Sequence, residues 1–285
     1  MASYTILYNP LAGNGSGYKM AKSLRKKMKG ETLHYQDFTR ILDYEDFMAN
    51  LPEGERIIVC GGDGTLNRFI NYTGGAKIGR DIFYCPGGSG NDFMKDLDEP
   101  QTGYPVCINK YVANLPYATV KGKNYYFQNG IGMGLDGYCC EIGEQSRGRS
   151  TRPINYTKIA IEGIMFHYKP CNAIVSVDGR THSYKKVWLT AVMKGRYFGG
   201  GMMPTPNQDR LNPENTVSVM VIHDVGKLSL MTLLPTVFKG THIEYTKNVT
   251  VLSGHEVKIE YDRQATVQID GEVIPGVSSF DVVSR

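Results

Sequence analysis

The stretch IIVCGGDGTLNRF, residues 57–69, predicts a strand, a loop and a helix in direct succession. Ile57 to Cys60 are apolar and mostly β-branched, as in a buried strand, and apolar residues return at helical spacing from Leu66 to Tyr72. The glycines between them break both patterns. Such a loop can direct backbone N–H groups toward an anion at the helix N-terminus, although glycines that only form a tight turn would look the same.

Two more predicted strands, Tyr4–Tyr8 and Ile82–Cys85, are also followed by glycine-rich loops. These loops are NPLAGNGSG at residues 9–17 and PGGSGNDF at residues 86–93. Helical spacing between the strands, as at residues 18–28, predicts a parallel sheet of an α/β domain. The carboxyl ends of parallel strands meet at one edge, so we expect the three loops to converge there. This convergence favours a phosphate site over three unrelated turns.

From about residue 105 the chain changes to short segments of period-two alternation separated by turns, which predict an antiparallel sandwich or open barrel. Helical spacing interrupts them near Asn155–His167 and Leu228–Phe238. The change of pattern predicts a domain boundary near residues 100–115. The predicted strands are Tyr117–Val120, Tyr125–Gly130, Ala173–Asp178, Trp188–Met193, Thr216–His223, Val249–Ser253, Glu256–Tyr261 and Thr266–Asp270.

Composition excludes several classes of protein. The chain has 285 residues, of which 41% are hydrophobic and 21% charged, as is ordinary for a soluble globular protein. Its longest apolar segments fall short of the roughly 20 residues that a membrane span needs. Six cysteines without a C-x-x-C pair favour reduced thiols over a disulfide framework or a zinc site. The N-terminus lacks leader features, so we expect a cytoplasmic protein.

The net charge of +4 is mild, and basic residues concentrate at Lys19–Lys29. Most such runs are solvated helix faces; the alternative is attraction to phosphates or to an anionic membrane surface. The run has no accompanying nucleic-acid motif, so no nucleic-acid partner is expected. Lys19, Arg149 and Arg152 are candidates for neutralising phosphate charge, with an ordinary surface role as the alternative.

The Walker pattern is absent, and no G-x-G-x-x-G follows the first predicted strand. Instead, GGDGTLN at 61–67 together with GGSGNDF at 87–93 resembles the catalytic domain of the diacylglycerol kinase and sphingosine kinase-like lipid kinases, in particular their soluble bacterial members. GGDGT alone also occurs in NAD kinases and phosphofructokinases, so it is the combination of the two motifs that indicates the lipid-kinase branch. Further similar motifs are NP-x-x-G at 9–13, NGIGMGLDG at 129–137, GRYFGGGMMPTP at 195–206 and IDGE at 269–272.

The resemblance implies a Rossmann-like, three-layer α/β domain of the NAD kinase and phosphofructokinase type, followed by an antiparallel β-sandwich. With the change of pattern, it gives an α/β nucleotide-binding domain at residues 1–112 and a sandwich domain for the lipid acceptor at residues 113–277. A final strand within residues 278–285 would return to the first domain. The active site would lie between the two domains.

The implied activity is transfer of the γ-phosphate of ATP, with Mg²⁺, to a lipid hydroxyl, with diacylglycerol as the expected acceptor and phosphatidic acid as product. The expected partners are ATP and a lipid acceptor at the membrane surface, reached by peripheral contact, and a homodimer stays open. An NAD kinase is one alternative, although its Asn-Asp/Glu pair is only partly mimicked by Asn91-Asp92. A catalytically silent nucleotide or lipid sensor is another, although it would not need the carboxylates of the motifs.

The glycine loops are expected to contact the nucleotide through backbone N–H groups and short polar side chains. These residues are Asn9, Gly13, Gly62, Gly64, Thr65, Asn67, Gly88, Ser89 and Asn91. Carboxylates suit Mg²⁺, which keeps several of its waters. By resemblance Asp63 and Asp92 hold the ion, and Asp63 is also catalytic. For each of them the alternative is a turn aspartate that accepts hydrogen bonds from backbone N–H groups.

Asp270 and Glu272 are two residues apart, so on a strand both side chains would point to the same face. Repulsion between two carboxylates there would favour a proton acceptor. By resemblance Asp270 is the general base and Glu272 is a catalytic partner linked to magnesium. A hairpin turn at Asp270-Gly271 is the alternative. Asp209 is a further candidate metal ligand, in a loop that lacks the Asp-Gly turn typical of the family.

Overall fold

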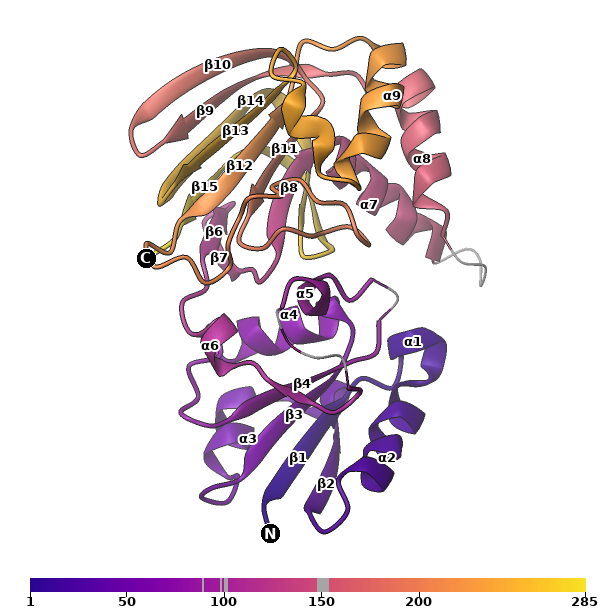
Figure 1. Cartoon of the computed structure of the whole chain (residues 1–285), viewed down its shortest axis with the longest axis vertical. Coiled ribbons are helices and arrows are strands. Elements are labelled where there is room, and N and C mark those ends of the chain that lie inside the picture. The colour runs from indigo at the N-terminus through magenta and orange to yellow at the C-terminus, as the bar shows by residue number, and fades with distance from the viewer. Residues whose placement is uncertain (89, 98, 100–101, 148–153) are drawn as a thin grey trace. The chain divides into compact units, whose positions relative to one another are not determined.

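The computed structural model describes residues 1–88, 90–97, 99, 102–147 and 154–285. The chain forms two compact units, Met1–Leu115 and Pro116–Arg285 (Figure 1). All six cysteines lie within the described residues as free thiols, as predicted. None of the helices in these ranges is long and apolar enough to cross a membrane.

The first unit contains a five-stranded sheet with the order β2-β1-β3-β4-β5. The first four strands run parallel and β5 runs antiparallel to β4, which confirms the predicted α/β class. The strands are β1 (Ser3–Tyr8), β2 (Thr32–Asp37), β3 (Arg56–Gly61), β4 (Ile82–Pro86) and β5 (Val106–Cys107). The helices are α1 (Ala12–Gly15), α2 (Gly17–Lys27), η1 (Phe38–Arg40), α3 (Tyr44–Ala49), α4 (Asp63–Tyr72), α5 (Asp92–Lys95) and α6 (Asn109–Val112).

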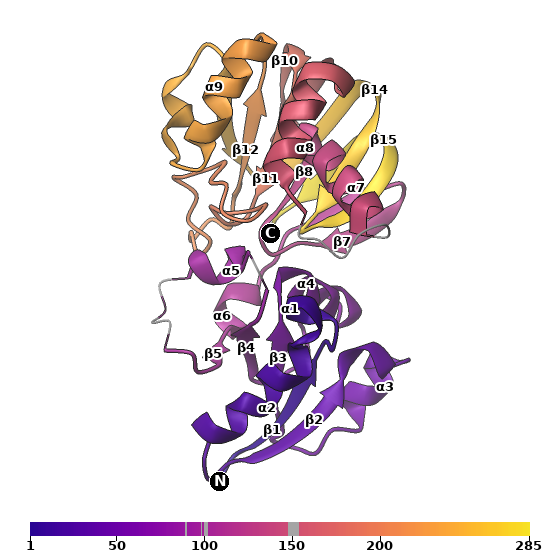
Figure 2. The same ribbon diagram turned by 90° about the vertical axis from the view of Figure 1, so that its right-hand side faces the viewer.

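Strand β3 is buried on both faces of this sheet. Ile58 and Cys60 pack with Ala21 and Leu24 of α2 on one face, whereas α3 lies on the opposite side of the sheet (Figure 2). A parallel strand covered on both faces needs a continuous apolar run, which is what the sequence has at this point. Strand β2 was not predicted, because this edge strand is half-exposed and its sequence is largely polar.

The second unit is built on a ten-stranded antiparallel sheet. Its main path runs β13-β12-β11-β8-β14-β15-β6-β7, and β9 joins β10 to β14. The strands are β6 (Tyr117–Val120), β7 (Lys123–Tyr126), β8 (Gly130–Gly134), β9 (Cys171–Val177), β10 (Arg180–Val187), β11 (Leu189–Met193), β12 (Val217–Ile222), β13 (Val249–Gly254), β14 (Glu256–Ile269) and β15 (Glu272–Val283). The helices are α7 (Leu135–Arg147), α8 (Tyr156–Glu162), η2 (Gly163–His167), α9 (Lys227–Val237) and η3 (Thr241–Glu244).

Two different strands pair with one edge of the long strand β14. Its first part pairs with β9 and its last residues pair with β8, while on the other edge its pairing with β15 shifts register after Glu260. The strands enclose an apolar core that includes alternate residues of β9, such as Val175 and Val177. A second core lies between the sheet and the helices and contains Trp188 and Leu233. This arrangement agrees with the predicted antiparallel β-sandwich.

The predicted return of the last strand to the first domain is wrong. β15 pairs with β14 along its length and with β6 near its end, both in the second unit. Phe280 and Val282 are buried in the core of that unit, and this burial keeps the strand there. The second unit therefore includes residues 278–285, which the sequence analysis assigned to the first domain.

Two further elements differ from the prediction. Residues 125–130 do not form one strand but the end of β7, a loop and the start of β8. Helix α7 was missed, because Gly137 and Gly143 weaken the helical signal. A Cβ atom at Gly137 would lie 1.9 Å from the carbonyl oxygen of Thr266, so this helix position needs glycine for close packing on β14.

Phe280→Ala tests the assignment of β15. We expect the variant to lower the free energy of unfolding of the second unit by about 3–5 kcal/mol, because it removes a fully buried ring. The only tryptophan, Trp188, is buried in this unit, so denaturation followed by its fluorescence reports on the second unit. Ser279→Ala, at the exposed neighbouring position, is the control. An unchanged fluorescence midpoint for Phe280→Ala would contradict the assignment.

Candidate functional site

The three glycine-rich loops of the first unit meet at the carboxyl edge of its sheet. β1 pairs with β2 on one side and with β3 on the other, both in parallel, so the strand order reverses at β1. In open α/β sheets, ligands bind beyond the carboxyl ends of the strands at such a reversal. The Asn9 amide donates to the Thr65 hydroxyl at 3.4 Å, which joins the loop after β1 to the start of α4.

The loops after β3 and β4 pass each other backbone to backbone. The Gly87 N–H donates to the Gly61 carbonyl at 2.8 Å. A Cβ atom at Gly62 would lie 3.0 Å from the Gly88 Cα, and one at Gly88 would lie 2.8 Å from the Gly62 Cα. Both glycines are therefore required by packing. At Gly64 a Cβ atom would meet none of the described atoms within 4 Å, so the start of α4 is open at this point.

Asp63 connects the same two loops through its side chain. One carboxylate oxygen accepts the N–H of Asp92 and the other accepts the N–H of Phe93, each at 3.0 Å. These donors belong to the first turn of α5, and hydrogen bonds to a carboxylate are stronger than those between neutral groups. The structure thus gives Asp63 the role of accepting backbone hydrogen bonds, which the sequence analysis held as the alternative to metal binding. The two roles are compatible, because each oxygen has more than one lone pair.

The other predicted nucleotide contacts lie in or beside these loops. Asn91 adopts a left-handed conformation (φ 50°), and its side-chain oxygen accepts the Gly88 N–H at 3.0 Å. Asn67 is buried in α4 and accepts the Asn71 amide. Gly13 lies in α1, next to the loop after β1. Ser89, Arg149 and Arg152 lie outside the described residues, and Lys19 is exposed on α2.

The predicted metal ligands come from both units of the chain. Asp63 and Asp92 belong to the first unit and Asp209 and Glu272 to the second. Within the ranges that the structure describes, no three acidic, histidine or cysteine side chains are grouped closely enough to hold a metal ion. The buried Asp92 lies 3.4 Å from the Lys95 ammonium. A Mg²⁺ ion here would therefore depend on one or two carboxylates together with substrate phosphates and water, which is how proteins usually bind it.

Asp270 is not on a strand but in the tight turn between β14 and β15, so the predicted same-face pair with Glu272 is wrong. Asp270 (φ 46°) and Gly271 (φ 92°) both have positive φ, as a two-residue Asp-Gly hairpin turn requires. The Asp270 carboxylate accepts the N–H groups of Gln128, Asn129 and Gly130 at 2.7–3.0 Å. These bonds hold the loop between β7 and β8 and explain why residues 125–130 are not one strand.

Arg210 supports the same loop from its other side and was not singled out in the sequence. Its buried guanidinium donates to the Gln128 carbonyl and to the Asn129 side-chain oxygen. The buried Lys194 lies nearby, and burial with the Arg210 charge lowers the pKa of its ammonium to about 8. The negative charge of Asp209 opposes this lowering of the Lys194 pKa, so Asp209 offsets part of the positive charge of Lys194 and Arg210. One of its carboxylate oxygens accepts the Leu211 N–H at 2.8 Å.

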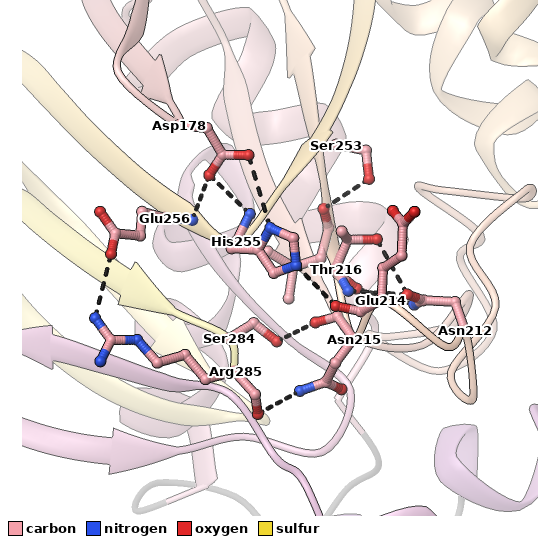
Figure 3. A network of polar contacts seen from close by, with 11 residues as sticks. Asp178, Asn212, Glu214, Asn215, Thr216, Ser253, His255, Glu256, Ser284 and Arg285 are labelled. Carbon is pink, nitrogen blue, oxygen red and sulfur yellow. Dashed lines mark hydrogen bonds and ion pairs between the residues drawn. The ribbon is translucent and has the colours of Figure 1, made fainter.

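A polar network joins the loop before β12 to the last residues of the chain (Figure 3). The Lys194 ammonium donates to the Asn215 side chain. Asn215 in turn donates to the Arg285 carbonyl at 2.7 Å, and its own carbonyl accepts the Ser284 hydroxyl. His255 contacts the Glu214 carbonyl at 2.7 Å, which fixes the same loop to the start of β14. The loop before β12 is therefore anchored independently of any ligand.

Gln268 links the Asp270 turn to a second buried carboxyl group. Its side-chain oxygen accepts the Gly271 N–H at 3.0 Å, and its amide donates to Asp136 at 3.2 Å. Burial raises the pKa of Asp136 to about 7, although hydrogen bonds from Gln268 and from the backbone oppose the shift. Asp136 lies in the NGIGMGLDG motif, which is the only signal in the sequence that points to it.

Gly88→Ala tests the contact between the two loops of the first unit. The added methyl group would meet backbone atoms that cannot move aside, so we expect a loss of about 1–3 kcal/mol in stability. Gly64→Ala is the matched control, since its methyl group would enter open space. Scanning calorimetry should show a lower unfolding temperature for Gly88→Ala alone. Equal unfolding temperatures would mean that the loops are not held backbone to backbone.

Asp136→Asn tests the buried carboxyl group. Between pH 3.8 and about 7 the folded state keeps the proton that the unfolded state loses, so the parent loses stability as the pH rises through this window. The asparagine variant lacks this loss. Its stability relative to the parent should increase from about pH 5 to about pH 8, by up to roughly 1.4 kcal/mol per pH unit within the window.

Glu99→Gln is the control for this measurement. Hydrogen bonds from Lys110 and Tyr111 hold the pKa of Glu99 below 4.5, so its carboxyl group is ionised in the folded state and largely ionised in the unfolded state across the tested range. Its stability relative to the parent should stay constant when denaturation is repeated at the two pH values. A constant difference for Asp136→Asn as well would show that its carboxyl group titrates normally.

Comparison with known proteins agrees with this architecture. Residues 3–115 match the diacylglycerol kinase catalytic domain, and residues 129–283 match the YegS C-terminal NAD kinase beta sandwich-like domain. YtlR of Bacillus subtilis, whose name assigns it provisionally to the lipid kinases, is 23% identical over 312 residues, which cover 100% of this chain and 97% of that protein. A diacylglycerol kinase of Mycobacterium tuberculosis is 23% identical over 254 residues, covering 84% of this chain and 79% of that protein.

Two solved structures from Bacillus anthracis share the fold. One, whose name assigns it provisionally to the diacylglycerol kinases, matches with a TM-score of 0.64 and 18% identity, with 99% of this chain and 94% of that one covered. The other, named a diacylglycerol kinase, matches with a TM-score of 0.62 and 18% identity, with 99% of this chain and 93% of that one covered. Along the chain, the catalytic-domain match precedes the sandwich-domain match, which is the domain order expected from the sequence. The chain belongs to the diacylglycerol kinase family of lipid kinases, with a YegS-type C-terminal domain.

Proposed function

We propose that the protein transfers the γ-phosphate of ATP to the hydroxyl group of a lipid, with diacylglycerol as the acceptor and phosphatidic acid as the product. Phosphoryl transfer needs positioning, neutralisation of phosphate charge and removal of one proton from the attacking hydroxyl. ATP supplies the phosphoryl group and Mg²⁺ neutralises its charge when both are bound. The residues of the chain bind and orient the reactants and accept the proton.

The meeting of three glycine-rich loops at the reversal of the sheet supports this proposal most strongly. The contact between Gly62 and Gly88 fixes two of the loops before a ligand arrives. Beside it, the open position at Gly64 leaves room for a phosphate at the start of α4, where the helix dipole favours an anion. We assign the triphosphate to this place, with Asp63 and Asp92 as the carboxylates that would hold Mg²⁺ when it is bound.

In the second unit, we assign proton acceptance to Asp270. Three N–H donors stabilise its ionised form and fix its orientation. Arg210 is a positioning residue in this scheme, since it acts on the Asp270 carboxylate only through the loop at Gln128 and Asn129.

The test is transfer of labelled phosphate from ATP to pure lipid acceptors in mixed micelles, with NAD in a parallel sample. We expect label in a chloroform-soluble product that requires Mg²⁺ and diacylglycerol. Asp270→Asn should lower turnover by about 10²- to 10⁴-fold, as loss of a general base does, with ATP affinity retained. Gly64→Ala should weaken ATP binding, measured by calorimetry, without loss of stability.

Each other outcome identifies a different function. Label in NAD would make the protein an NAD kinase, and ATP binding without transfer to any acceptor would make it a sensor. Trp188 fluorescence controls for folding, because a lower unfolding midpoint of Asp270→Asn would show that the turn was disrupted. A loss of ATP affinity in Asp270→Asn equal to its loss of turnover would assign Asp270 to ligand binding.

A further inference from the structure

Helix α9 lacks the charged outer face that a surface helix normally has. No charged residue lies between Lys227 and Lys239, in a segment that reads LSLMTLLPTVFK from residue 228. Yet the helix is not enclosed by the protein: Leu228 is 74% exposed and Phe238 is 51% exposed. A surface helix normally carries charged residues on the face away from the core. The outer face of α9 is uncharged: its exposed polar side chains are the small hydroxyl residues Ser229 and Thr232, beside the large apolar side chains already named.

The inner face of the helix already accounts for its packing. Leu230, Leu233 and Val237 belong to the core between the sheet and the helices, so they explain only one stripe of the apolar residues. The exposed stripe contains Leu228, Thr232, Pro235 and Phe238. Helix α2 shows the usual contrast, since its exposed positions are largely lysine and arginine.

A second exposed apolar side chain lies beside the start of α9. The Lys227 ammonium donates to the Met165 carbonyl at 2.7 Å, which joins α9 to the end of η2. The next residue, Phe166, is 75% exposed. Figure 1 shows α8, which continues into η2, next to α9 in the second unit. Phe166 and the exposed stripe of α9, which includes Leu228 and Phe238, form what we call the α9 face.

The charges around the α9 face favour an anionic partner. Lysines stand at both ends of α9, at Lys227 and Lys239, and Lys158, Lys169 and Lys247 are exposed in the neighbouring segments. The acidic side chains there are Asp224, Glu162 and Glu244. Glu162 lies 3.6 Å from Lys158, so these two charges offset each other, and the other four lysines outnumber the two remaining carboxylates. Exposed apolar side chains with lysines beside them can bind an anionic bilayer, because the apolar groups leave water and the lysines reach the headgroups.

We propose that the α9 face docks the protein on a membrane that contains anionic lipids. Phe166, Leu228 and Phe238 would enter the boundary between headgroups and acyl chains, while the lysines extend to the headgroups. This inference rests on the proposed function, because a lipid kinase must meet an acceptor that stays in the bilayer. It adds which surface of the chain makes that contact and which lipid charge it selects.

The test is co-sedimentation of the full chain with phosphatidylcholine vesicles, with and without about one third phosphatidylglycerol, in the absence of ATP. We expect binding to the anionic vesicles. The double variant Phe166→Ser/Leu228→Ser should weaken it by about tenfold or more, because two large side chains no longer leave water. Lys227→Gln and Lys239→Gln should each weaken it by about fivefold, and added salt should reduce this effect.

Leu42→Ser is the matched control, since Leu42 is 99% exposed but lies in the first unit. It should bind vesicles as the parent does. Equal binding of the double variant and the parent would overturn the proposal, as would equal binding to neutral and anionic vesicles. A dimer that the double variant converts to monomer would also overturn it, because a second copy would then be the partner of this face.

The binding test is independent of catalysis. If the parent binds anionic vesicles through the α9 face but phosphorylates no lipid, the docking surface stands and the proposed kinase activity fails. If it phosphorylates a short-chain, water-soluble diacylglycerol but binds no vesicles, the activity stands and the docking surface fails. The double variant should retain its rate on that soluble acceptor, because its two changed residues lie outside the groups assigned to catalysis.

Discussion

The carboxylate of Asp63 holds the loop after β3 against the first turn of α5, and the arrangement of the glycine loops depends on this contact. Its two oxygens bond to the N–H groups of Asp92 and Phe93, while the backbones of Gly62 and Gly88 pass too closely for a side chain. The loops are therefore ordered before a ligand binds, which lowers the entropy cost of capturing a phosphate. Asp270 does the same in the second unit, where one carboxylate orders three consecutive residues of a loop. In each unit, an aspartate carboxylate therefore holds backbone segments together by accepting their N–H groups.

The parts of the fold that follow from local chemistry could be predicted from the sequence. A strand buried on both faces must be a continuous apolar run, and Ile57 to Cys60 form one; the glycines after it must form a loop. This reasoning gave the α/β domain and its three converging loops. It failed at Asp270, because an Asp-Gly pair followed by alternating residues is compatible with a strand or a turn. It also failed for β15, whose place is decided by the burial of Phe280 among distant strands.

The missed residues are those whose role depends on partners far away in the chain. Arg210 contacts a loop 81 and 82 positions away, and Gln268 reaches Asp136 across 132 positions. Neither has a neighbour in the sequence that reveals this function, so an arginine in a polar loop and a glutamine in a strand look ordinary. The α9 face differs, because the lack of charge from 228 to 238 is visible in the sequence alone. Only the structure shows that one side of this uncharged helix is exposed, so a pattern typical of a buried helix belongs here to the protein surface.

The motif glycines divide into those that packing requires and those that it does not. In NGIGMGLDG, a Cβ atom at Gly130, Gly132, Gly134 or Gly137 would lie 1.7–2.5 Å from a neighbouring atom, so the interior of the second unit explains this whole motif. In GGDGT, the first two glycines are likewise confined, by Thr65 and by Gly88. Gly64 is the exception, since a side chain there would meet none of the described atoms within 4 Å. The fold gives no reason for glycine at this position, and a ligand that approaches the backbone closely does. Because Gly64 lies in the first turn of a helix, on the carboxyl edge of a parallel sheet, the proposed phosphate site is placed there.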